Sequence, residues 1–206
     1  MNIIKHSWQW AHGLSARSAT DAIVIHHAAA DSATPEGIHA YHLSQGWAGI
    51  GYHFYIRKDG SVHEGRPLWA SGAQVKDHNW HTLGVCLEGN YDVPGAIVPQ
   101  AQMDALHEVL RYLRGIYPKA AIKFHRDFGG SVCPGRYFPA EKALDFEREE
   151  DKVPVDDRPW YIKNGEWEEA KKLGIIDGMR PEDKLTRAEG AAMVLRAYKL
   201  AKEGNT

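Results

Sequence analysis

The sequence has little cysteine, no long apolar run and almost no net charge, and each shortage excludes a class of protein. With 2 cysteines in 206 residues, it is not a small disulfide-stabilised scaffold. No apolar stretch approaches the roughly 20 residues that cross a bilayer, and the N-terminus lacks the apolar core of a signal peptide. A formal net charge of −2 offers no basic surface for nucleic acid. We therefore expect a protein made in the cytoplasm, with no membrane insertion and no nucleic-acid partner.

What the sequence does contain is enough apolar residues, 43%, to build a core, in two kinds of spacing. Short apolar runs predict β-strands at residues 22–26, 52–57, 83–87 and 122–125. An Asp-Gly turn after residue 57 predicts a hairpin to residues 62–64. Helices are predicted from the Thr34-Pro35 cap to about residue 45, and after Pro99, where apolar residues recur every three or four positions. This order predicts an α/β fold with a mixed central β-sheet flanked by helices.

The composition changes near residue 145, which predicts a second, smaller unit. Residues 1–145 are expected to form the main domain, and the charged residues 146–158 have no apolar period and are expected to be a linker. Residues 159–206 contain two amphipathic segments, and a Thr186–Glu189 capping box opens the second. We expect a small C-terminal helical module there.

Two histidines and a cysteine have the surroundings of metal ligands. His26 ends the apolar run 22–25, and His125 follows the apolar run 120–124. Cys133 comes eight positions after His125, across a Gly-Gly pair that lets the chain turn back. Two imidazoles and one thiolate fill three corners of a zinc tetrahedron and leave the fourth for water, as in catalytic sites. The alternative is chance, because a free cysteine is often a small core residue, which is our expectation for Cys86.

Four segments also occur in the order of a known family. They read Ala-Ile-Val-Ile-His-His-Ala at 22–28, Gly-Trp and Gly-Tyr-His-Phe within 46–54, Leu-Gly-Val-Cys-Leu-Glu-Gly-Asn at 83–90, and Phe-His through Cys-Pro-Gly at 124–135. Residues 20–140 thereby resemble the zinc-dependent N-acetylmuramoyl-L-alanine amidases of the phage-lysozyme and peptidoglycan-recognition-protein family. The resemblance implies cleavage of bacterial peptidoglycan at the amide bond between N-acetylmuramic acid and L-alanine, with zinc on His26, His125 and Cys133.

The same resemblance implies roles for further residues. Tyr52 is expected beside the zinc-bound water as a hydrogen-bond donor, although a tyrosine in a strand is usually a core residue. Ser131 stands where the family has lysine or threonine, so the general acid stays open. Glu88 is a candidate base, with a structural strand-end carboxylate as the equal alternative. The predicted substrate contacts are Trp47, His53, Trp69 and Asn79.

Residues 159–206 resemble a single S-layer-homology repeat of the kind appended to phage endolysins. This implies binding to a secondary wall polymer, whereas the alternative is a helical hairpin that packs on the main domain or on a second copy of the chain. Together the two resemblances imply a phage endolysin that accumulates in the cytoplasm and acts on the cell wall after release. The rival interpretations are a peptidoglycan-recognition protein that binds without cutting, and a structural zinc domain with four protein ligands.

Overall fold

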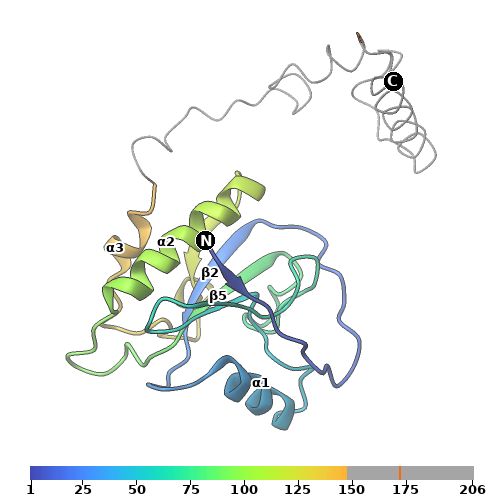
Figure 1. The fold of residues 1–206 in the computed structure, drawn as a ribbon, viewed down its shortest axis with the longest axis horizontal. Helices are drawn as coiled ribbons and strands as arrows, with labels where there is room; N and C mark the ends of the chain where they lie inside the picture. Colours follow the sequence, from blue (N-terminus) through green and yellow to red (C-terminus); the bar gives the residue numbers. More distant parts are fainter. Residues whose placement is uncertain (148–171, 173–206) are drawn as a thin grey trace, which may run out of the picture. The chain divides into compact units, whose positions relative to one another are not determined.

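The computed structural model describes residues 1–147 and Lys172. Contacts divide the chain into two units, Met1–Val153 and Pro154–Thr206 (Figure 1). The predicted linker at 146–158 and helical module at 159–206 lie outside the described residues, apart from residues 146, 147 and 172.

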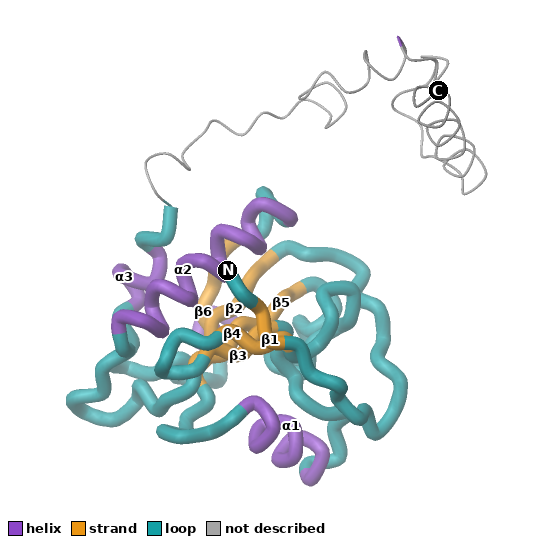
Figure 2. Tube along the Cα trace, viewed as in Figure 1, coloured by secondary structure: helices purple, strands orange, loops and turns teal. Residues whose placement is uncertain are grey.

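A mixed sheet of six strands, in the order β1-β4-β3-β5-β2-β6, organises the first unit (Figure 2). Its strands are β1 (Ile3–Ile4), β2 (Ala22–His27), β3 (Phe54–Ile56), β4 (Val62–Glu64), β5 (Thr82–Leu87) and β6 (Ala121–Phe124). Only β3 and β4 pair antiparallel, across the predicted Asp-Gly turn, and the other neighbours are parallel. The predicted α/β fold with a mixed central sheet is confirmed.

The strand predicted from residue 52 begins two residues later. The backbone of Gly51 and Tyr52 bonds outside the sheet: the Tyr52 carbonyl accepts from the Arg66 N–H at 2.8 Å, and the Gly51 carbonyl accepts from the Ala73 N–H at 3.0 Å. Tyr52 therefore lies on a loop at the start of β3, not within the strand. Strand β1, a two-residue edge strand, was not predicted.

Within residues 1–147, three α-helices and one 3-10 helix accompany the sheet: α1 (Pro35–Ser44), α2 (Gln100–Ile116), α3 (Ala140–Leu144) and the 3-10 turn His125–Phe128. Helix α1 starts as predicted, because the Thr34 hydroxyl accepts from the Gly37 N–H at 3.1 Å and Pro35 opens the first turn. Helix α2 is the amphipathic helix predicted after Pro99, whereas α3 was not predicted. None of the described helices has the length and apolarity needed to cross a membrane.

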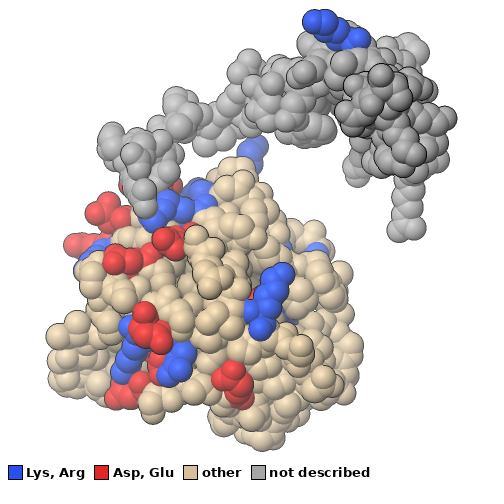
Figure 3. Space-filling model, in the orientation of Figure 1, with Lys and Arg blue, Asp and Glu red and all other residues tan. Residues whose placement is uncertain are grey.

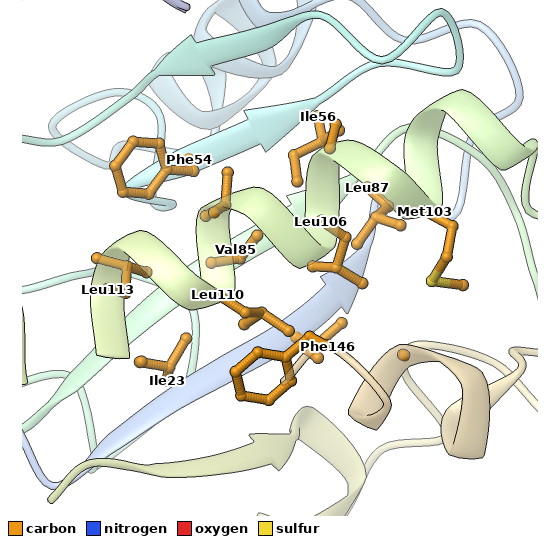
Figure 4. Close-up of a cluster of buried hydrophobic side chains, with 14 of the residues drawn as sticks. Ile23, Phe54, Ile56, Val85, Leu87, Met103, Leu106, Leu110, Leu113 and Phe146 are labelled. Carbon is orange, nitrogen blue, oxygen red and sulfur yellow. The ribbon is translucent and has the colours of Figure 1, made fainter. Parts of the chain in front are cut away.

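The main core lies between the sheet and α2 (Figure 4). Leu106 and Leu110 of α2 pack against alternate strand residues, including Ile23 and Val85. Helix α1 lies on the other side of the sheet from α2 and α3 (Figure 1), where Ile38 joins a smaller cluster with Cys86. Successive residues of β2 therefore face different surroundings, and His26 shares its face with Val24 rather than with the α2 core.

Candidate metal centre

The three predicted metal ligands meet at one point of the structure. The ligand atoms of His26, His125 and Cys133 all lie within 4.8 Å of one another. Strands β2 and β6 are parallel neighbours with Ile25 opposite Phe124, so the next residue of each chain segment brings the two imidazoles side by side. Their ring centroids are 4.7 Å apart. Parallel pairing of two strands about a hundred residues apart thus places two of the three donors.

The loop after the 3-10 turn supplies the third donor. Gly129 and Gly130 adopt φ values of 82° and 68°, a conformation that glycine takes without strain, and they turn the chain back toward β2. The Arg126 N–H then donates to the Cys133 carbonyl at 2.9 Å and closes the loop. At the sulfur, the backbone N–H of His27 donates to Cys133 Sγ at 3.4 Å.

The spacing of these donors fits zinc. Cys133 Sγ lies 3.7 Å from His26 Nδ1. A tetrahedral ion with bonds of about 2.0 Å to nitrogen and about 2.3 Å to sulfur holds such atoms about 3.5 Å apart. Within residues 1–147, no fourth histidine, cysteine or carboxylate joins the group. The donor set is therefore that of an open three-ligand site, which disfavours the rival structural zinc domain.

Burial sets the protonation of the donors. It lowers the pKa of His26 to about 3, with a further contribution from His125, and it also lowers the pKa of His125. Both imidazoles are therefore neutral at pH 7 and have a lone pair free. Burial raises the pKa of the Cys133 thiol to about 11, opposed by the His27 N–H and the charge of Arg126. A cation at this point would favour the thiolate that the site needs.

Gln74 contacts the other side of the His26 ring and was not predicted from the sequence. Its Oε1 atom is hydrogen-bonded to His26 Nε2, and its Nε2 donates to Thr82 Oγ1 at 2.7 Å. The Asn79 side-chain oxygen accepts from the backbone N–H of Gln74 at 2.8 Å and of Val75 at 3.1 Å. Asn79, a predicted substrate contact, thus has its side-chain oxygen committed to the loop that carries Gln74. No periodicity or spacing marks Gln74.

Tyr52 lies beside the donors on a loop that α1 holds in place. Its ring centroid is 5.2 Å from that of His26. Burial raises the pKa of Tyr52 well above its usual value, with further contributions that include a side-chain hydrogen bond with Cys86, so the phenol keeps its proton. His42 of α1 accepts from the Gly51 N–H at 3.0 Å, and its ring is 4.7 Å from that of Trp47, which is 44% exposed. Tyr52 and Trp47, both predicted site residues, are therefore on one wall.

A hollow of about 270 Å³ adjoins Trp47 and contains a buried cation that sequence reasoning missed. Arg66 lines it and donates to the carbonyls of Ile50 at 2.8 Å and Ser71 at 2.7 Å. Burial lowers the pKa of Arg66 to about 10, which still leaves it charged at neutral pH. No carboxylate of the described residues pairs with it, so the hollow presents an unbalanced positive charge.

Two of the predicted site residues are committed to the fold instead. Glu88 is buried and receives hydrogen bonds from Arg57 Nε at 3.1 Å and from the Lys58 N–H at 3.0 Å, so it is a structural strand-end carboxylate rather than a free base. His53 has no exposed surface, and its ring nitrogens bond to the Gly84 N–H and the Ala70 carbonyl. The structure therefore does not support substrate contact by His53 or base catalysis by Glu88.

The remaining predicted residues occupy different places. Ser131 lies in the ligand loop, where its Oγ accepts from the Cys133 N–H at 3.1 Å and keeps its own proton available. Trp69 is 58% exposed beside Ala70, near the start of β3, and makes no ring contact with the donors among residues 1–147. In the view of Figure 3, acidic and basic side chains are interspersed over an otherwise uncharged surface.

Comparison with known proteins gives a consistent set of relatives. The family model for Amidase_2, N-acetylmuramoyl-L-alanine amidase, matches residues 16–136. The endolysin of Enterobacteria phage K11 is 42% identical over 125 residues, which cover 57% of this chain and 82% of that protein. The endolysin of Escherichia phage T7 is 37% identical over 124 residues, with the same two shares.

A solved structure is similar as well. The N-acetylmuramoyl-L-alanine amidase LysC from Clostridium intestinale URNW matches with a TM-score of 0.66 and 38% identity, over 69% of this chain and 95% of that one. The residues that match the family model include all three donors of the cluster, Tyr52 and Gln74.

Proposed function

Because this chain belongs to the Amidase_2 family of N-acetylmuramoyl-L-alanine amidases, we propose that it is a phage endolysin that uses zinc to cleave peptidoglycan between N-acetylmuramic acid and L-alanine. Peptidoglycan hydrolysis follows from the family and from the endolysins that the chain resembles. The observation that supports zinc is the convergence of His26, His125 and Cys133 within 4.8 Å, inside the matched region.

The side chains around these donors suit amide hydrolysis. Zinc, when held by the three donors, supplies a Lewis acid and a water acidic enough to react at neutral pH. Tyr52 keeps its proton and lies beside His26, so we assign it to donate a hydrogen bond to the carbonyl oxygen as negative charge develops there. Ser131 is the second candidate donor, because its oxygen already accepts from Cys133 and its proton is uncommitted.

The wall next to Tyr52 is the proposed substrate-binding surface. Trp47 offers a half-exposed ring on which a sugar or its lactyl group can pack. Arg66 lines the neighbouring hollow without an acidic partner, and stem peptides carry carboxylates. A buried cation gains most from an anion that replaces its lost water, so we infer that an acidic group of the stem peptide binds there.

Digestion of purified walls tests the proposed reaction. The zinc-loaded protein is expected to release new amino groups, with L-alanine at the new N-termini by mass spectrometry, and no new reducing sugar ends. Protein stripped with a chelator should be inactive, and added zinc should restore it. New reducing ends would identify a glycosidase, and zinc-loaded protein that binds walls without releasing amines would be a recognition protein.

We also propose that residues 159–206 bind a secondary wall polymer and that the protein acts on the wall after its release at lysis. The basis is the sequence resemblance of that segment to an S-layer-homology repeat. A chain ending near residue 150 should still hydrolyse soluble muropeptides but sediment less with intact walls. Equal sedimentation of both forms would remove the wall-binding role, and a change in the number of subunits on truncation would assign the segment to self-association.

A further inference from the structure

The two ring nitrogens of His26 face two different partners. Nδ1 faces Cys133 Sγ at 3.7 Å, on the side where the three donors meet. Nε2 faces the side-chain amide of Gln74 on the opposite side of the ring. A neutral imidazole carries one proton, so only one of these nitrogens has a lone pair for a metal.

The hydrogen-bond chain behind Gln74 determines which nitrogen that is. The Thr82 hydroxyl donates its only proton to the His78 carbonyl at 2.8 Å. Its oxygen must then accept from Gln74, at 2.7 Å, and only the amide nitrogen can donate. The amide oxygen consequently faces His26 and can only accept, which requires the imidazole proton to be on Nε2. The lone pair of His26 is left on Nδ1, directed at the cluster.

Asn79 and Gly84 shape the space that the Gln74 side chain occupies. Asn79 accepts from two successive backbone N–H groups, of Gln74 and Val75, and so fixes the chain from which the amide projects. Beneath it, β5 has Gly84, where a Cβ atom would come within 2.8 Å of Gln74 Cγ. Strand β5 therefore carries no side chain at the point where the Gln74 side chain crosses it.

We propose that Gln74 is a positioning residue that fixes the tautomer of His26, so that Nδ1 is the nitrogen presented to the metal. The inference rests on the proposed zinc site, but it concerns a proton that is present with or without the metal. Partners of this kind typically change metal affinity about 10- to 100-fold when removed.

Three variants of the full chain test the inference. Gln74→Met keeps the length and removes the acceptor, Gln74→Glu keeps an acceptor toward His26, and Thr82→Val removes only the hydroxyl that orients the amide. Nitrogen-15 NMR of the zinc-free protein reports the His26 tautomer, competition with a chromophoric chelator reports zinc affinity, and thermal unfolding controls for folding.

Wild-type protein and Gln74→Glu should have the proton of His26 on Nε2. Gln74→Met should give a mixture of tautomers and lose about 10- to 100-fold in zinc affinity. Thr82→Val, which frees the amide to rotate, should lose less than Gln74→Met and shift the tautomer in the same direction.

An unchanged tautomer together with zinc affinity within about twofold of wild type in Gln74→Met would overturn the inference. If Gln74→Met does not fold, an unchanged tautomer in Thr82→Val would do the same. Should wild-type protein fail to bind zinc while the tautomer responds as expected, the proposed function fails and the role of Gln74 stands.

Discussion

The two faces of β2 are both buried, yet they depend on different physical effects. On the face toward α2, Ile23 and Ile25 belong to the main apolar cluster, where complementary volume is the main requirement. On the opposite face, His26 is equally buried, but each ring nitrogen faces one particular partner. Apolar contacts tolerate exchange between side chains of similar volume, whereas a buried polar atom that loses its partner costs about 1–3 kcal/mol.

Removing a donor from the polar face should have the largest effect. Cys133→Ser replaces a thiolate by a neutral hydroxyl, a far weaker zinc ligand. We expect a loss of zinc affinity beyond the about 100-fold that a residue behind a ligand costs, together with loss of wall hydrolysis. Metal content and released amines measure both. The matched control is Cys86→Ala, which removes the other buried cysteine and should keep zinc, and full activity with normal zinc in Cys133→Ser would contradict the assignment.

Acid should act on the polar side through its neutral imidazoles. Burial lowers the pKa of His42 to about 4 and that of His53 to about 3, against 6.5 in the unfolded chain. Their contribution to stability is therefore complete above about pH 6.5 and is lost as the pH falls toward 4. From pH 7.5 to pH 5, we expect a loss of about 2 kcal/mol from each of these two histidines.

Urea unfolding of the zinc-free protein at several pH values measures this loss. His42→Gln should flatten the dependence, because an amide does not titrate in this range. A wild-type profile that is flat from pH 7.5 to 5 would contradict the prediction.

The phenol of Tyr52 allows a test of chemistry without loss of the metal. Tyr52→Phe should fold and bind zinc normally, yet lose about 10² in turnover, the range for a positioned donor. Tyr55→Phe is the matched control, because its buried hydroxyl donates to the Ala33 carbonyl at 2.7 Å and should cost stability rather than turnover. Turnover within twofold of wild type in Tyr52→Phe would make Tyr52 a packing residue. Ser131→Ala should show a smaller loss, and Glu88→Gln chiefly a loss of stability.

The apolar face should respond least, and only in stability. Ile25→Val removes one methylene next to His26 in sequence but on the α2 side, and should cost about 0.5–1.5 kcal/mol of unfolding free energy. Zinc affinity and turnover per folded molecule should not change. A fall in zinc affinity would show that the two faces of β2 are energetically coupled through the strand.

The sequence predicts the apolar part of the fold better than it predicts the polar partners of the site. Short apolar runs predicted β2, β3, β5 and β6, the Thr34-Pro35 cap predicted α1, and apolar residues at every third or fourth position predicted α2, because these signals are local in the chain. The predicted ligand His26 faces Cys133 in the structure, whereas the ring of the adjacent His27 accepts from the Tyr91 N–H. The two-residue strand β1 was too short for any period to appear.

Side-chain partners across irregular loops could not be predicted in this way. Gln74 meets His26 across 48 positions of sequence, and its role depends on an amide orientation that Thr82 sets. The surroundings of Glu88 and His53 could not be predicted for a related reason, since a polar residue at a strand end has the same sequence pattern whether it faces a substrate or a backbone group. Tyr52 was identified only through the family resemblance.

The sequence distance between the donors has a consequence for the stability of the folded chain. His26 and Cys133 are 107 positions apart, and between them lie α1, α2 and every strand of the sheet except β1 and β2. An ion held by both acts as a cross-link that closes this long loop, and such closures reduce the entropy of the unfolded chain most when the loop is long. A zinc ion bound as proposed would therefore stabilise the folded chain against unfolding, so we expect loss of zinc to expose the domain to proteolysis at the same time as it abolishes cutting.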